Sequence, residues 1–437
     1  NYQSSASAEI ALTPFYNGPV WYVDQTVSGA SHEGSPNDPF REIEDAIDEA
    51  SDGDTVLVLP GTYDRNGDQH LSFENSNGTG KNIVLISRDG AGTTFLDGEG
   101  KRVFDIEHST DTTLHIIGFT ITASNGGWTE TNGNSNGSIV RVMPEYLDPF
   151  SNASGDYTSG VTFKNCVFTM FESGDLVAQK DLTDAVVYID KGHAVFDNCT
   201  FTNISVGGSQ EGWTGAHGTG RSSAAIKVGK VNDSNSMGPG SILRVNRCTF
   251  TDNTIKSTLV GEYIYGGVMG LGPSINHNVQ LINTIIADNL IDVQHNNDNN
   301  APPSGGALEL RGGNVSIINS TIVNNELRTS ASQPGLGSAI HIKDPHDDGN
   351  EPMFTMFNSI IHGNTTTTNT GSNVAEQIYI IDDNDGVDTY FSFSIIEGDD
   401  DFGGDDIIHS DPGFLDSTYA LHPRSFAIGV GSNEGEN

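Results

Sequence analysis

The segments VQLINTIIADN, residues 279–289, and VSIINSTIVNN, residues 315–325, decide the fold of this chain. In both, apolar residues alternate with other residues up to an asparagine, Asn283 or Asn319, and a further β-branched or apolar run follows. Alternation with a period of two is typical of a strand, and asparagine tolerates the left-handed backbone of a tight bend. Each segment therefore predicts a strand, a bend and a second strand.

Six further segments align with these two, and they begin at Leu114, Val161, Ala194, Ile242, Met356 and Tyr390. Eight copies indicate a repeat protein, in which polar tracts rich in Gly, Asn and Asp leave the coils as long loops. Strand, bend and strand with columns of like residues are typical of a parallel β-helix. We predict an all-β chain that forms one elongated domain, a right-handed parallel β-helix.

Two columns of residues recur at the bend. The first holds Asn165, Asn198, Asn283, Asn319 and Asn358, with Arg247 in this place once. Stacked amides of this kind can hydrogen-bond from coil to coil. The second column holds Cys166, Cys199, Cys248, Thr284, Ser320, Ser359 and Ser394. Because no C-x-x-C spacing points to a metal, we expect the cysteines to be small residues in one interior lane.

The stretch SGGALELRGGN, residues 304–314, belongs to a second repeated motif. It aligns with IVRV, VVYI, AIKV, VMGL, AIHI and QIYI, which begin at Ile139, Val186, Ala225, Val268, Ala339 and Gln377. The apolar pair in each copy, such as Leu308 and Leu310, is expected to face the core, so the residue between them faces outward. Gly305 and Gly306 then form a bend. A phosphate loop would need a following helix with Lys and Ser or Thr.

The chain is strongly acidic, with 20 Lys and Arg against 58 Asp and Glu and a formal charge of −38 at pH 7. Such a surface repels nucleic acid backbones and anionic membranes, so neither is an expected partner. No apolar run of about 18 residues is present that could insert into a membrane. The acidic, Gly- and Asn-rich composition favours an extracellular protein that is secreted or attached to a cell surface.

Both ends of the chain resemble a known family. Residues 21–63 contain Pro-Phe before an amphipathic helix at Arg41–Ala50, then Gly-Asp-x-Val and Pro-Gly-Thr-Tyr. This pattern resembles the start of pectate-lyase-like right-handed parallel β-helix proteins. SDPGFLDSTYALHPRSFAIGVG, residues 410–431, resembles the closing segment of their bacterial secreted and surface-anchored members. The resemblance implies an N-terminal cap and first coil at 1–63, coils at 64–409 and a closing segment at 410–437. A C-terminal anchoring or sorting domain often follows, and we expect it to be absent from this chain.

The outward residues of the second motif form the candidate site. They are Arg141, Tyr188, Lys227, Gly270, Glu309, His341 and Tyr379, and two positions further along are Asp190, Gly229, Gly272, Arg311 and Lys343. Adjacent coils lie about 4.8 Å apart, so these rows suit an extended glycan. The candidate substrate-binding residues are Arg141, Tyr188, Asp190, Glu309, Lys343 and Tyr379. The alternative is a solvated face of mixed polar residues.

Three members of these rows are candidate catalytic residues, namely Lys227, Arg311 and His341. A lyase needs a base for the proton next to a uronate carboxylate and cations for the developing charge. Lys227 is the candidate base and Arg311 the candidate cation. A glycoside hydrolase needs two carboxylates roughly 5 to 10 Å apart, whereas Asp190 and Glu309 are expected to lie three coils apart.

Ca²⁺ is the cofactor that the sequence suggests. The candidate ligands are Glu309 and three carboxylates of the acidic loop DDNDGVD, which are Asp382, Asp385 and Asp388. None of the acidic loops has the spacing of an EF-hand. Solvated acidic turns are the alternative.

These observations lead to one expected function and two alternatives. We expect an extracellular or cell-surface β-helix that binds a glycan or another surface through its outer face and loops, as in adhesion. A calcium-dependent lyase acting on a polyuronate is the first alternative. A structural stalk or filament subunit is the second.

Overall fold

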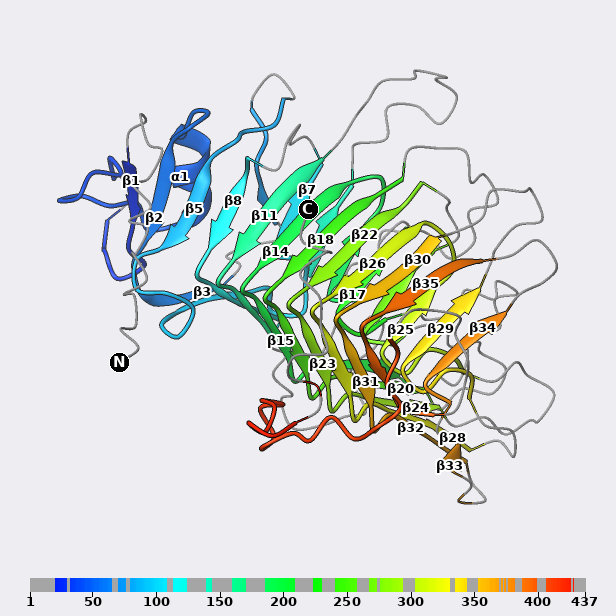
Figure 1. Ribbon diagram of the computed structural model, residues 1–437. Coiled ribbons are helices and arrows are strands. Elements are labelled where there is room, and N and C mark those ends of the chain that lie inside the picture. The colour runs from blue at the N-terminus through cyan, green and yellow to red at the C-terminus, as the bar shows by residue number, and fades with distance from the viewer. Residues whose placement is uncertain are drawn as a thin grey trace, which may run out of the picture.

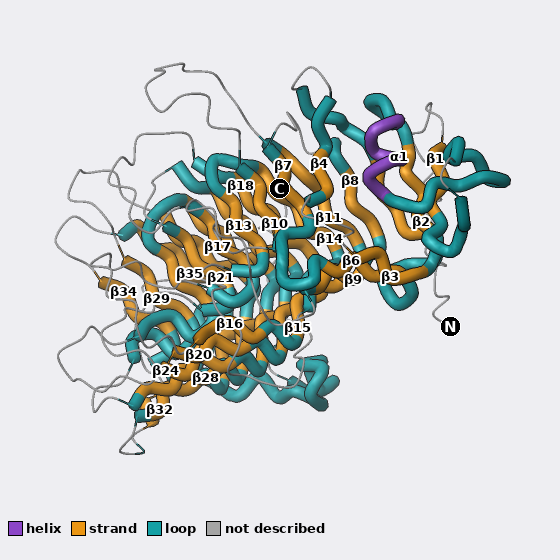
Figure 2. Tube along the Cα trace, turned by 180° about the vertical axis from the view of Figure 1, so that it is seen from behind, coloured by secondary structure: helices purple, strands orange, loops and turns teal. Residues whose placement is uncertain are grey.

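The computed structural model describes the chain as a series of ranges. These are residues 20–29, 32–64, 70–75, 79–107, 113–123, 139–143, 159–169, 185–208, 223–229, 240–257, 267–272, 276–293, 303–330, 335–343, 353–368, 371, 373–374, 376–381, 387–398, 406–425 and 427. Their coils are stacked along one axis from β1 to β34 and β35, and the views from opposite sides show the same elongated stack (Figures 1 and 2).

Four sheets run along this axis, and each takes its strands from successive coils. The 11-stranded sheet contains β1 (Val20–Val23), β2 (Thr55–Val58), β5 (Val84–Ser87), β8 (His115–Ile117), β11 (Gly160–Lys164), β14 (His193–Asp197), β18 (Ile242–Asn246), β22 (Asn278–Ile282), β26 (Asn314–Ile318), β30 (Met353–Phe357) and β35 (Asp388–Ser392). The nine-stranded sheet contains β4 (Leu71–Ser72), β7 (Phe104–Ile106), β10 (Val140–Val142), β13 (Val187–Ile189), β17 (Ile226–Val228), β21 (Met269–Leu271), β25 (Leu308–Leu310), β29 (Ile340–Lys343) and β34 (Ile378–Ile381).

The other two sheets complete the coils. The ten-stranded sheet contains β3 (Gly61–Asp64), β6 (Thr94–Asp97), β9 (Thr120–Thr122), β12 (Val167–Phe168), β15 (Thr200–Thr202), β19 (Thr249–Thr251), β23 (Ile285–Ala287), β27 (Thr321–Val323), β31 (Ile360–His362) and β36 (Ile395–Ile396). The six-stranded sheet contains β16 (Ser205–Gly208), β20 (Thr254–Ser257), β24 (Leu290–Val293), β28 (Glu326–Thr329), β32 (Thr365–Thr367) and β33 (Asn373–Val374).

Neighbouring strands pair in parallel from coil to coil, whereas β32 and β33 are antiparallel. Val279 of β22 pairs with Val315 of β26, so the two segments that decide the fold lie on neighbouring coils. The predicted all-β parallel β-helix is therefore confirmed.

Alternation along each strand builds the core. Leu308 and Leu310 are buried on the inner side of β25, and Val279 and Leu281 are buried on the inner side of β22. Like residues meet in register, and the rings of Phe168, Phe201 and Phe250 form one stack with centroids 4.5 Å apart at each step. Burying a side chain of this size contributes about 1.5 to 3 kcal/mol to folding.

The asparagine column at the bend has the predicted conformation. Its members have φ between 48° and 54°, in the left-handed region, and these are Asn165, Asn198, Asn283, Asn319 and Asn358. Arg247 adopts the same conformation with φ 54°. Asn198 Nδ2 donates to Asn165 Oδ1 at 2.7 Å, one of the expected hydrogen bonds from coil to coil.

A longer amide ladder, which the sequence analysis did not identify, lies at the next bend. Its members are Asn253, Asn289, Asn325 and Asn364, all buried. Asn253 Nδ2 donates to Asn289 Oδ1 at 2.9 Å, and the next two steps are 2.8 Å each. Each amide nitrogen also donates to a backbone carbonyl oxygen, so the ladder pairs polar groups that burial would otherwise leave without water.

The cysteines are free, buried members of one lane, as predicted. Side chains of this lane accept hydrogen bonds from the backbone of the preceding coil. Cys199 N–H donates to Cys248 Sγ at 3.3 Å, and Thr284 N–H donates to Ser320 Oγ at 3.1 Å. A thiol and a hydroxyl thus serve the same purpose in this position.

The backbone of the GGALEL stretch bends at Gly305 and lies close to the following coil at Gly306. Gly305 has φ +70°, which favours glycine, and confirms the predicted bend. A Cβ on Gly306 would lie 1.8 Å from the carbonyl oxygen of Ser338 on the following coil. Any side chain at Gly306 would therefore push the coils apart.

The predicted N-terminal helix is present as α1 (Ile43–Glu49), shorter than Arg41–Ala50. Its buried residues are Ile43, Ala46 and Ile47, and it packs beside β1, β2 and β4. Lys81 Nζ donates to the carbonyl oxygens of Ile47 and Asp48 at 2.7 and 2.8 Å, which holds the end of the helix. Its role as a cap over the first coil stays a prediction.

In the described part of the chain no helix is long and apolar enough to span a membrane.

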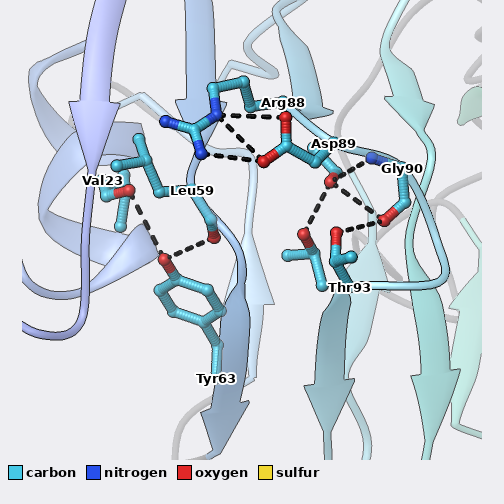
Figure 3. Close-up of polar contacts among 9 residues, drawn as sticks. Val23, Leu59, Tyr63, Arg88, Asp89, Gly90 and Thr93 are labelled. Atoms are coloured by element: carbon cyan, nitrogen blue, oxygen red, sulfur yellow. Dashed lines mark hydrogen bonds and ion pairs between the residues drawn. The ribbon is translucent and has the colours of Figure 1, made fainter.

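Polar contacts fasten the first coils (Figure 3). Tyr63 Oη donates to the carbonyl oxygen of Leu59 at 2.9 Å, and burial raises the pKa of Tyr63 to about 12, so its phenol keeps the proton. Arg88 Nη2 binds Asp89 Oδ2 at 2.8 Å on the surface beside it. These contacts join residues of the first coils to one another, so we assign them a structural role.

Residues 406–425, which run from the end of the predicted coils into the predicted closing segment at 410–437, fold back along the coils. Ile408 forms a bridge with Ile395, and Tyr419 hydrogen-bonds through its hydroxyl to Asp288 and Asn324. Asp288 and Asn324 lie at bends of two neighbouring coils, with φ of 57° and 54°. The closing segment therefore crosses from one coil to the next. The division of the chain at residues 63 and 409 stays a prediction.

Candidate functional site

One row of residues runs along the outward side of the nine-stranded sheet. The strand register places each member beside the next, in the order Asp105, Arg141, Tyr188, Lys227, Gly270, Glu309, His341 and Tyr379. We call this set the outer row. Seven of its members were predicted from the second repeated motif, and Asp105 of β7 is an addition from the structure.

The outer row faces away from the core and yet is shielded from solvent. Tyr188 is 1% exposed, Lys227 6%, Glu309 1% and His341 3%. Tyr379 is half-buried. This burial contradicts the alternative of a solvated face for the middle of the row, because a solvated face leaves its polar side chains in water.

Asp105 anchors the N-terminal end of the outer row. Its carboxylate accepts hydrogen bonds from Arg141 Nε and Nη2 at 2.6 and 2.5 Å and from Arg102 Nη1 at 2.8 Å. Arg141 also pairs with Glu107. Arg141, a predicted substrate-binding residue, is therefore committed to two carboxylates of its own chain.

Tyr188 and Lys227 form the next contact. Lys227 Nζ lies 5.8 Å from the centroid of the Tyr188 ring, within the range of a cation–π interaction. The register places these two side chains on neighbouring strands, β13 and β17. Lys227 is thus a positive charge held on a ring in a place that is largely out of water.

Glu309, His341 and Tyr379 form the C-terminal part of the outer row. His341 Nδ1 lies 2.7 Å from Glu309 Oε2, and the His341 ring stacks on Tyr379 with centroids 5.8 Å apart and an angle of 18°. Among the described residues, Glu309 Oε1 and His341 Nε2 are buried and have no hydrogen-bond partner. Leaving such a group unpaired costs about 1 to 3 kcal/mol, so these two atoms call for an explanation.

The second predicted row lies two positions further along the strands. Asp190, Gly229 and Gly272 are buried, whereas Arg311 and Lys343 are half-buried. A Cβ at Gly229 would lie 2.4 Å from His277 Nε2, so the histidine occupies the space over this glycine. His277 Nδ1 accepts the Ser241 N–H at 3.0 Å, and burial lowers the pKa of His277 to about 4. His277, which the sequence analysis passed over, is therefore a neutral histidine near neutral pH.

The predicted calcium ligands are not brought together by the described residues. Glu309 lies on the nine-stranded sheet and bonds His341 through Oε2, whereas Asp388 begins β35 of the 11-stranded sheet. Asp382 and Asp385 lie outside the described residues. No group of three or more His, Cys, Asp or Glu suited to a metal occurs within the described ranges. Since Ca²⁺ takes six to eight oxygen ligands, the described residues alone do not fit it, and calcium stays a prediction.

The chain matches no family model and no curated protein sequence. Among solved structures, it is similar to a pectate lyase at 15% identity, with 96% of this chain and 93% of that chain covered and a TM-score of 0.37. A GH136 lacto-N-biosidase from Eubacterium ramulus is similar at 12% identity, with 86% and 59% covered and a TM-score of 0.37. A PL6 family polysaccharide lyase from Pseudopedobacter saltans is similar at 14% identity, with 87% and 94% covered and a TM-score of 0.26.

Proposed function

We propose that this protein is an extracellular or cell-surface β-helix that binds an extended glycan along the outer row. The observation that supports the proposal is the run of in-register polar and aromatic side chains on one outward face, from Arg141 to Tyr379. Coils repeat about every 4.8 Å, a spacing close to that of sugar units in an extended chain.

The contacts within the outer row support this proposal. Lys227 rests on Tyr188, and His341 is held between Glu309 and Tyr379. Side chains that are already fixed lose little further conformational entropy when a ligand binds. A set of ordered donors, acceptors and rings is the kind of surface that recognises sugar hydroxyls and sugar faces.

A lyase acting on a polyuronate is the second candidate. Lys227 would be the base that removes the proton next to the uronate carboxylate. Arg311 would neutralise developing charge two coils away from Lys227. This activity produces an unsaturated uronate, so ultraviolet absorbance during incubation with alginate and pectate, with and without Ca²⁺, tests it directly.

The glycan proposal is tested by binding to a glycan array, followed by calorimetry with the best ligand. We expect Lys227→Ala to weaken binding about tenfold, because it removes a donor and the charge that rests on Tyr188. Lys164→Ala is the matched control, since Lys164 is a half-buried outward lysine of β11 on the 11-stranded sheet. Equal affinity of both variants and the wild type, or the absence of any glycan ligand, would contradict the proposal. End-to-end self-association without glycan binding would favour a structural stalk instead.

A further inference from the structure

The two unpaired atoms of the outer row lie on residues that are hydrogen-bonded to each other. Glu309 uses Oε2 for His341 and leaves Oε1 without a partner in the described part of the chain, and His341 likewise leaves Nε2. The two residues face each other on neighbouring strands, β25 and β29. Both unpaired atoms therefore belong to one small, solvent-shielded part of the outer row.

The hydrogen-bonding character of these atoms follows from their contact. An ionised carboxylate accepts hydrogen bonds and donates none, so the proton between the two residues belongs to His341 Nδ1. A neutral imidazole with its proton on Nδ1 carries a lone pair on Nε2. With Glu309 ionised and His341 neutral, Glu309 Oε1 and His341 Nε2 are two acceptors, and a ligand with two donors would pair both.

The neighbouring position in the outer row carries no side chain. Gly270 lies between Lys227 and Glu309 in the register, so the Cα atoms of these two residues are separated by two coil spacings, about 10 Å. Lys227 of β17 borders this position on one side, and Glu309 of β25 borders it on the other, with His341 one strand further along.

We infer that the stretch of the outer row from Gly270 to His341 is a subsite for a neutral sugar that presents two neighbouring hydroxyl groups. One hydroxyl donates to Glu309 Oε1 and the other to His341 Nε2, while the Lys227 ammonium donates to an oxygen on the opposite side of the ring. This inference rests on the proposed function and names the class of sugar.

A uronate fits the same acceptors poorly. Its carboxylate has no proton to donate, and it would face the Glu309 carboxylate in a chain whose formal charge is −38. Hydroxyl groups avoid both conflicts. The subsite therefore favours neutral glycans over polyuronates.

Access to the subsite has a consequence for the rate of binding. Both acceptor atoms are shielded from solvent without a ligand, so a sugar reaches them only after part of this surface rearranges. Association that requires such a change is slower than ordinary docking.

The test is calorimetric titration of the full chain with oligosaccharides of equal length. The neutral probes are cello-, manno- and xylo-oligosaccharides, and the uronate probes are oligogalacturonate and oligoalginate. We expect at least one neutral probe to bind tenfold or more tightly than both uronates. Tighter or equal binding of a uronate would overturn the subsite while leaving the proposed glycan function intact. If no probe bound and a wider array also gave no ligand, both would fall.

Two variants locate the binding at the two acceptors. Glu309→Gln can bond His341 through its amide oxygen and then turns a donor toward the sugar, and His341→Phe keeps a ring over Tyr379 without the acceptor. Each is expected to weaken neutral-sugar binding at least tenfold. The matched controls are Glu326→Gln of β28 and His362→Phe of β31, both half-buried on other sheets. If the acceptors hold only water, both variants will bind like their controls, and the inference is wrong.

Discussion

The two ends of the outer row differ in how completely their polar atoms are paired. Asp105, at the N-terminal end, has both carboxylate oxygens bonded, Oδ1 to Arg141 and Oδ2 to Arg141 and Arg102. Glu309, toward the C-terminal end, has one oxygen bonded to His341, and the other has no partner among the described residues. Removing one partner of a buried charge pair strongly lowers the free energy of unfolding, because the other charge is left unpaired. A buried acceptor without a hydrogen-bond partner also lowers the free energy of unfolding. The Asp105 end therefore stabilises the fold, whereas we propose that the Glu309 end binds a ligand.

The largest effect is expected at the structural end. Asp105→Ala removes a carboxylate that two guanidinium groups share out of water, so the free energy of unfolding should fall by about 3 to 5 kcal/mol. Denaturant unfolding followed by circular dichroism measures it. Asp197→Ala is the control, because Asp197 pairs with Arg247, whose side chain is 56% exposed, and such surface pairs contribute about 1 kcal/mol or less. If both variants lost the same free energy of unfolding, Asp105 would contribute no more to stability than a surface ion pair.

A smaller effect is expected from His277, a buried histidine with a structural hydrogen bond. Its pKa is about 4 in the folded chain and its ordinary value is 6.5, so the unfolded chain binds this proton first as the pH falls. The stability is fully present above pH 6.5 and is lost toward pH 4, by about 3 kcal/mol in all.

The His277→Gln variant isolates this contribution from the titrating carboxylates. The wild type should lose about 3 kcal/mol more than the variant between pH 6.5 and pH 4, measured by denaturant unfolding at a series of pH values. If the free energy of unfolding of the wild type and of the variant changed in parallel with pH, His277 would have the same pKa in the folded and the unfolded chain. His277 would then resemble an exposed histidine, contrary to its burial.

The smallest effect on stability is expected at the ligand-binding end. Replacing both partners, Glu309→Leu together with His341→Phe, removes two buried polar groups and their two unpaired atoms at once. Such a double replacement is close to neutral, so the unfolding free energy should change by less than about 1 kcal/mol. A loss as large as that of Asp105→Ala, in the same denaturant assay, would show that this end of the row is also structural.

The repeated pattern was enough to predict the coils and their bends. Alternation and the asparagine at each bend depend on local backbone geometry, and the left-handed φ of Asn283 and Asn319 confirms them. The cysteine lane was predictable for the same reason, because a column of small residues reflects the space inside a coil. The second amide ladder was missed although its signal is visible, since Asn253, Asn289, Asn325 and Asn364 all close the aligned segments.

The candidate site was predictable only in part. The pattern identified which residues face outward, because the side-chain period of a strand is two. The pattern gave no information on which atoms cover the outward side chains, so the burial of Lys227 and Glu309 was not predicted. The alignment placed Glu309 beside His341, but it did not reveal their hydrogen bond, and it missed Asp105, the partner of Arg141.

The most direct measurement of the central claim is a crystal structure with the tightest-binding neutral oligosaccharide. We predict a sugar unit over the outer row between Gly270 and His341, with one hydroxyl within hydrogen-bond distance of Glu309 Oε1 and a neighbouring hydroxyl within that distance of His341 Nε2. The account is contradicted if the sugar lies elsewhere on the molecule, or if water alone contacts both atoms while the sugar is bound.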